Sequence, residues 1–147
     1  MIHLDGNFTV KNEVKNAYDY VSNPDTLIKL IPDLIEYNKI DDNNLKITAK
    51  AGVSFIKGKF DLDLGIDHRV ENKHITLRGK GNGSGAAVDF TVDFDFNQNN
   101  DNAEVRWNAY INVVGTAASM GGKMIKSAIN KYITKLVDTY KETLGNN

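Results

Sequence analysis

The 147-residue sequence contains no cysteine and only two prolines. The absence of cysteine excludes disulfides, thiolate nucleophiles and zinc ribbons. Basic and acidic residues nearly balance, at 18 against 19, and a formal net charge of −1 offers no electrostatic argument for nucleic acid binding. The N-terminus also lacks the basic leader and unbroken apolar run of a signal peptide or a transmembrane helix. We therefore expect a cytoplasmic protein that does not bind nucleic acid.

A chain of this length can bury about 70% of its unfolded surface around one core, so we expect a single domain over residues 1–147. Alternating apolar residues predict a strand at 2–10. Two short helices should follow, the first capped by Asn12 and the second beginning at Asn23-Pro24-Asp25 and ending at Pro32. Period-two patterns then predict six further strands, at 34–40, 45–51, 58–70, 74–81, 86–97 and 103–114. The short turns between these strands favour antiparallel hairpins.

The last predicted element is a long helix over residues 119–144. Its apolar residues form two adjacent ladders with a spacing of four: Met120, Met124, Ala128, Tyr132, Leu136, Tyr140 and Leu144, beside Ile125, Ile129, Ile133 and Val137. At ~1.5 Å per residue the helix is about 38 Å long, enough to cross a curved sheet. Because the sheet has one apolar face to cover, we predict an α+β fold in which seven antiparallel strands curve around this helix.

The stretch Arg78-Gly79-Lys80-Gly81-Asn82-Gly83-Ser84-Gly85 superficially suggests a phosphate-binding loop. Neither the spacing of a Walker loop nor that of a dinucleotide loop is present, and no helix follows. Gly79 and Gly81 continue the apolar parity of Ile75 and Leu77, so they should face the interior. Two compatible readings remain: the glycines let the sheet bend and the helix start pack closely, or they leave space for an apolar ligand.

With this order of elements, the chain resembles a helix-grip domain of the START and birch-pollen-allergen type, a superfamily that also includes polyketide cyclases (SRPBCC). Within it, the sequence resembles the CoxG family, which is named for carbon monoxide dehydrogenase. The resemblance is carried by NPDTLIKLIPDL (23–34), AGVSFIKGKFDLDL (51–64), GKGNGSGAA (79–87) and VGTAASMGGKMIKSA (114–128).

The resemblance implies a hydrophobic cavity between sheet and helix, and non-enzymatic binding of a lipid or quinone-like molecule there. It also implies an accessory role beside a molybdenum-containing CO dehydrogenase, with peripheral membrane contact. No cofactor, metal or catalytic residue is expected. The expected cavity residues are Leu64, Ile66, His68, Leu77, Gly79, Gly81, Phe90, Val92, Trp107, Ile111, Met124, Ala128 and Tyr132. Phe55 and Ile56 are expected at the cavity mouth.

Two alternatives stay open. In the first, the chain is a cyclase- or hydratase-like enzyme of the same fold, with His68 as general base on the inward parity of Ile66 and Val70. In the second, the interior is solid and the chain is purely a docking protein. The outward aspartates of the strands need no metal, because they are the polar half of an alternating pattern.

Overall fold

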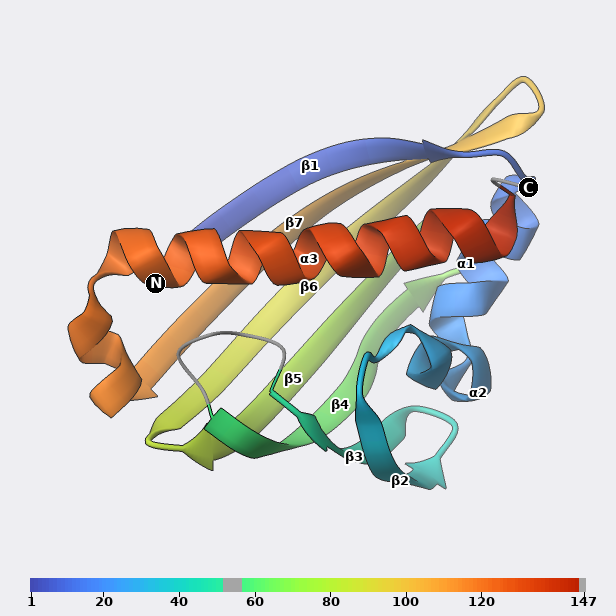
Figure 1. Cartoon of the computed structure of the whole chain (residues 1–147). Helices are drawn as coiled ribbons and strands as arrows, with labels where there is room; N and C mark the ends of the chain where they lie inside the picture. Colours follow the sequence, from blue (N-terminus) through green and yellow to red (C-terminus); the bar gives the residue numbers. More distant parts are fainter. Residues whose placement is uncertain (52–56, 146–147) are drawn as a thin grey trace.

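The computed structural model describes residues 1–51 and 57–145 and confirms the predicted helix-grip architecture. Figure 1 shows the order of the elements. They are β1 (Ile2–Val10), α1 (Val14–Ser22), α2 (Pro24–Leu27), the 3-10 turn η1 (Ile28–Leu30), β2 (Leu34–Asp41), β3 (Asn44–Lys50), β4 (Lys57–Val70), β5 (His74–Ser84), β6 (Ala86–Asn99), β7 (Asn102–Gly115), the 3-10 turn η2 (Thr116–Met120) and α3 (Gly122–Leu144).

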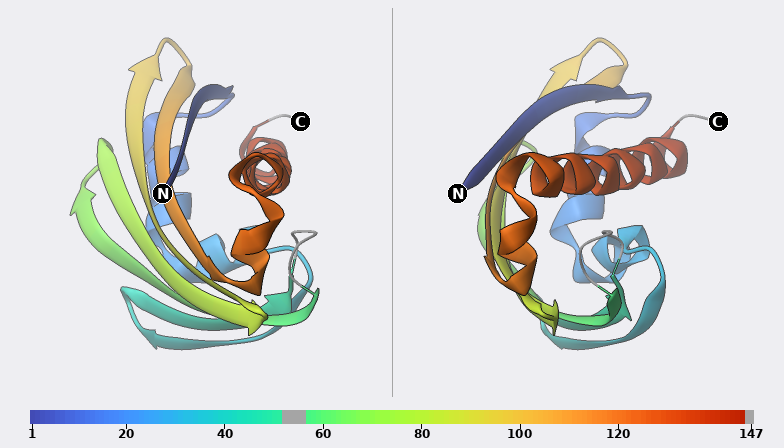
Figure 2. Two further views of the ribbon diagram at one scale, coloured as in Figure 1. Left: turned by 90° about the vertical axis from the view of Figure 1, so that its left-hand side faces the viewer. Right: turned by 60° about the vertical axis from the view of Figure 1, so that its left-hand side comes forward.

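The seven strands form one antiparallel sheet in the order β1-β7-β6-β5-β4-β3-β2. Only the β1–β7 pairing joins strands that are not consecutive in the sequence, so the sheet is a meander closed by its first strand. The sheet bends around α3, which crosses its concave face, while α1 and α2 close one end (Figures 1 and 2).

Burial follows the predicted alternation. Along β7 the inward residues Ala103, Val105, Trp107, Ala109 and Ile111 are buried, whereas the residues between them are half-buried or exposed. The edge strand β2 differs, because all eight of its residues are exposed. A strand with one buried face needs a covering layer, and α3 supplies it for the central strands.

The C-terminal half of α3 is tied to the first helix. The Tyr140 hydroxyl donates a hydrogen bond of 2.6 Å to the Ala17 carbonyl, and both residues are buried. Asn12, predicted to cap α1, accepts hydrogen bonds from the Glu13 backbone N–H and the Asn16 amide. It also donates one of 2.5 Å to the Leu144 carbonyl. These contacts fix the end of α3 against the start of α1.

Candidate functional site

A cavity of about 290 Å³ lies between the sheet and the C-terminal half of α3. Apolar side chains form nearly all of its wall. The helix contributes Ile129, Tyr132, Ile133, Leu136, Val137 and Tyr140, and the end near α2 and η1 contributes Leu27, Leu30 and Ile31. The sheet supplies the floor, which includes the inward residues of β3 to β7. A volume near 300 Å³ lies at the lower end of the range for small-molecule sites.

Three glycines shape the floor of this cavity by letting aromatic rings lie across the sheet. A Cβ atom on Gly6 would lie 2.8 Å from the Trp107 ring, and one on Gly81 would lie 2.6 Å from the Phe60 ring. A Cβ on Gly79 would overlap the Phe90 ring. Trp107, Phe60 and Phe90 all line the cavity. Their rings occupy the space of missing side chains, so they stand less far out toward α3.

This finding corrects one expectation. The space directly over Gly79 and Gly81 is not vacant, because Phe90 and Phe60 fill it. Phe90 is the cross-strand partner of Gly79, and Phe60 is a diagonal neighbour of Gly81 on β4. Cross-strand neighbours lie within ring contact of each other, which a pattern read along one strand does not reveal. The glycines therefore border the cavity indirectly, beneath the rings.

Of the thirteen residues expected in the cavity, the structure places seven on its wall: Leu64, Leu77, Phe90, Val92, Trp107, Ile111 and Tyr132. Ile66 is buried in the adjoining core with Val10 and Ile75 instead. The two glycines lie under the rings described above. His68, Met124 and Ala128 also lie off the wall, and Phe55 and Ile56 fall outside the described residues.

His68 faces outward because β4 carries an irregularity. Ile66 pairs with Leu77, but His68 pairs with Thr76, so Asp67 is an extra residue on this strand. One extra residue moves every later side chain to the opposite face. The His68 ring consequently lies exposed, 5.8 Å from the His74 ring on the outer face. The general base required by the alternative enzyme function is therefore not in the cavity.

Met124 and Ala128 miss the cavity because a ladder with a spacing of four winds around its helix. At about 100° per residue, side chains sixteen positions apart point about 160° away from each other. Since Tyr140 is buried, Met124 on the same ladder must face away, and its side chain is 60% exposed. The neighbouring ladder provides the buried Ile125 and Ile129 in its place.

The end wall formed by α2, η1 and β3 was not predicted as part of the site. Leu27, Leu30 and Ile31 were expected only as the apolar flank of a short helix, and Ile47 and Ala49 as core strand residues. Their apolar parity was the available signal. Their convergence on one space depends on how the sheet curls, which the linear pattern does not contain.

Polar groups on the wall are few. The Tyr140 hydroxyl is engaged with Ala17, and burial raises the pKa of Tyr140. Burial, with a smaller contribution from the charge of Asp33, raises the pKa of Tyr132 to about 12. Lys50 is exposed at the rim, where its backbone N–H donates to the Asp33 carbonyl at 3.0 Å. Within the described part of the chain, the Tyr132 hydroxyl has no hydrogen-bond partner, so it is free to bond a ligand.

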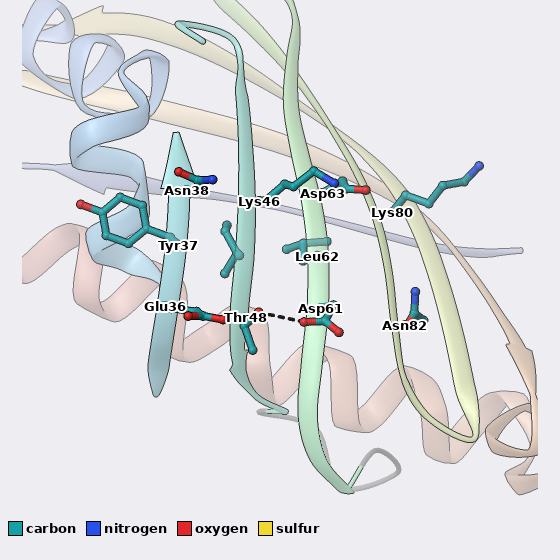
Figure 3. A pocket seen from close by; sticks show the side chains of 11 residues that line it. Glu36, Tyr37, Asn38, Lys46, Thr48, Asp61, Leu62, Asp63, Lys80 and Asn82 are labelled. Carbon is teal, nitrogen blue, oxygen red and sulfur yellow. Dashed lines mark hydrogen bonds and ion pairs between the residues drawn. The ribbon is translucent and has the colours of Figure 1, made fainter. Parts of the chain in front are cut away.

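A second hollow, of about 500 Å³, lies on the outer face of β2 to β5 and is polar (Figure 3). Thr48 donates a 2.8 Å hydrogen bond to Asp61, and Lys46 lies 3.7 Å from Asp63. These pairs are exposed, so the hollow resembles an ordinary solvated sheet face. Across residues 1–51 and 57–145, no cluster of His, Asp and Glu is arranged to hold a metal ion. No helix in those ranges is long and apolar enough to span a membrane.

Comparisons with known proteins agree with this architecture. The family model for the carbon monoxide dehydrogenase protein CoxG matches residues 6–145. A comparison with curated protein sequences finds no match. Among solved structures, a conserved protein from Geobacillus kaustophilus superposes with a TM-score of 0.89 at 19% identity, over 97% of this chain and 95% of that one.

Two further structures extend the likeness in fold. A START superfamily protein from Mycobacterium smegmatis superposes with a TM-score of 0.74 at 10% identity, over 97% of this chain and 96% of that one. The di-domain ARO/CYC BexL from the BE-7585A biosynthetic pathway gives 0.73 at 12% identity, over 97% of this chain and 46% of that one. Identities this low establish a shared fold, while the site must be argued from its own residues.

Proposed function

Because the chain belongs to the carbon monoxide dehydrogenase CoxG family, we propose that it binds a hydrophobic small molecule, such as a single-chain lipid or a quinone-like compound, between the sheet and α3. The observation that carries this proposal is the cavity of about 290 Å³ with an almost wholly apolar wall. An apolar space of this size favours a ligand that leaves water for it.

Binding without conversion is better supported than a cyclase or hydratase reaction. All three histidines, His3, His68 and His74, lie in outward register positions on the sheet. The described groups on the wall that can exchange a proton are two tyrosines and the rim lysine Lys50. Both tyrosines have raised pKa values, so neither is a base near neutral pH.

The proposed binding can be tested with the single tryptophan of the chain. Trp107 lines the cavity and is 8% exposed, so a bromoalkane inside the cavity should quench its fluorescence. We expect 1-bromodecane to quench in a saturable manner. Val92→Phe should abolish saturable quenching, because Val92 faces the cavity beside Leu77 and Ala109 and a larger side chain fills the space.

Thr91→Phe is the matched control, because Thr91 is the preceding residue of the same strand and faces outward beside Arg78 and Tyr110. It should leave quenching intact. Equal quenching of the wild type and Val92→Phe would contradict binding in this cavity.

We also propose that the chain acts as an accessory protein of a CO dehydrogenase-type molybdenum enzyme. The family description supports this partner. The start of α3 supports membrane contact, since the exposed Met120 and Met124 lie beside the exposed Lys123 and Lys126, a pairing that suits an anionic lipid surface.

This partner proposal has its own test. A tagged chain, isolated from cells that make both proteins, should bring down the molybdenum enzyme and should do so from the membrane fraction. Recovery of the chain without any molybdenum enzyme would overturn the accessory role, and recovery from the soluble fraction alone would overturn the membrane contact.

A further inference from the structure

We propose that the cavity selects a small, uncharged molecule carrying a carbonyl-type oxygen, and that the Tyr132 hydroxyl donates the hydrogen bond that recognises this oxygen. The inference rests on the proposed binding function and adds the chemical class of the ligand. It draws on the volume of the cavity, on the donors along its wall and on the charges at its rim.

The volume limits the size of the ligand. Liquid water occupies ~30 Å³ per molecule, so a space of about 290 Å³ accepts on the order of ten water-sized groups. This is one chain of about ten carbons, or a compact ring system. Both acyl chains of a membrane phospholipid cannot be enclosed in it, so a ligand of that kind would remain largely outside.

The polar groups limit the chemistry of the ligand. Tyr140 is engaged with the Ala17 carbonyl, which leaves the Tyr132 hydroxyl and the Trp107 indole N–H as donors on the wall. The indole nitrogen lies over Gly6, against the backbone of β1, whereas Tyr132 projects from α3 on the opposite wall. A donor that a bound ligand would cut off from water disfavours a purely apolar ligand and favours one that supplies an acceptor.

Charge at the rim argues against an anionic ligand. The Asp33 carboxylate acts on Tyr132, and Asp33 and Lys50 are joined through their backbones, so one negative and one positive group border this end. A carboxylate beside Tyr132 would lose its hydration and would also be repelled by Asp33. The Tyr132 hydroxyl keeps its proton at neutral pH, which suits a donor to a neutral oxygen.

The test uses displacement of 1-bromodecane from the cavity, read from recovery of Trp107 fluorescence, with decan-2-one, decane and decanoate as competitors at pH 8. Tyr132→Phe should weaken decan-2-one about fivefold, the usual worth of one hydrogen bond. Decane should bind the wild type and Tyr132→Phe equally. The melting temperature should not change, because the hydroxyl has no partner to lose among the described residues.

The outcomes separate the two proposals. An absence of saturable quenching by 1-bromodecane in the wild type would overturn the binding function and this inference together. Saturable quenching with an unchanged ketone affinity in Tyr132→Phe would overturn the inference alone. Decanoate binding tighter than decan-2-one, with the advantage lost in Lys50→Met, would assign recognition to an anion at the rim instead.

Discussion

Gly79→Val is expected to lower the free energy of unfolding by about 1–3 kcal/mol and to abolish saturable binding of 1-bromodecane. The Phe90 ring lies where the first carbon of any side chain at position 79 would stand. The ring must therefore rotate away from the sheet, and the space open to it is the cavity that it lines. Destabilisation and loss of binding should consequently appear together.

Urea denaturation and Trp107 quenching measure these two effects. Gly122→Ala is the control, since a Cβ there meets no atom within 4 Å and the residue begins α3. It should leave binding unchanged and should not destabilise the protein. A second variant, Gly79→Ala with Phe90→Leu, should recover part of the stability lost in Gly79→Ala alone. Wild-type stability and binding in Gly79→Val would contradict the packing of Phe90 over the glycine.

Tyr140→Ala is expected to destabilise the protein by about 3–5 kcal/mol, the range for removing a large aromatic side chain from a core. Tyr140 is 4% exposed and its ring contacts the edges of Phe8 and Tyr20, with centroids 5.8 Å apart in both pairs. The side chain thus joins α3 to β1 and α1. Its loss leaves a void beside the cavity and removes the hydrogen bond to Ala17.

Tyr140→Phe separates the hydroxyl from the ring. It should cost about 1–3 kcal/mol, because the buried Ala17 carbonyl loses its partner while the ring contacts remain. Equal losses of stability in Tyr140→Phe and Tyr140→Ala would show that the ring contacts contribute nothing, against this account.

Burial also links Tyr140 to alkaline pH. Its raised pKa keeps the hydroxyl protonated in the folded protein after the unfolded chain begins to ionise near pH ~10. The free energy of unfolding should therefore fall as pH rises above about 10, and it should fall less steeply in Tyr140→Phe. Urea denaturation at pH 8 and pH 11 measures the difference.

Local periodicity was sufficient to predict the fold. Alternation along residues such as Phe90, Val92 and Phe94 identified each strand and its inward face, and the short turns predicted the antiparallel order observed. The long helix followed from its apolar ladders and from the need to cover the sheet. These features depend on neighbours in the sequence, which is why the sequence alone reveals them.

The site was predicted less completely, for identifiable reasons. The extra residue at Asp67 turned His68 outward, and an inserted residue leaves no trace in an alternating pattern. Met124 was assigned inward because a ladder with a spacing of four was treated as straight, although it winds around the helix. The Phe90 ring reaches across strands to Gly79, a contact fixed by pairing register and not by local sequence.

The central claim is that the space between α3 and the sheet takes up an apolar molecule. Crystals grown with 1-bromodecane would test it most directly, because the anomalous scattering of bromine locates the ligand independently of the protein map. We predict a bromine peak inside the cavity, between Trp107 and the Tyr132–Leu136 face of α3. Bromine found only on the outer face of the sheet, or a cavity without bromine at saturating ligand, would contradict the account.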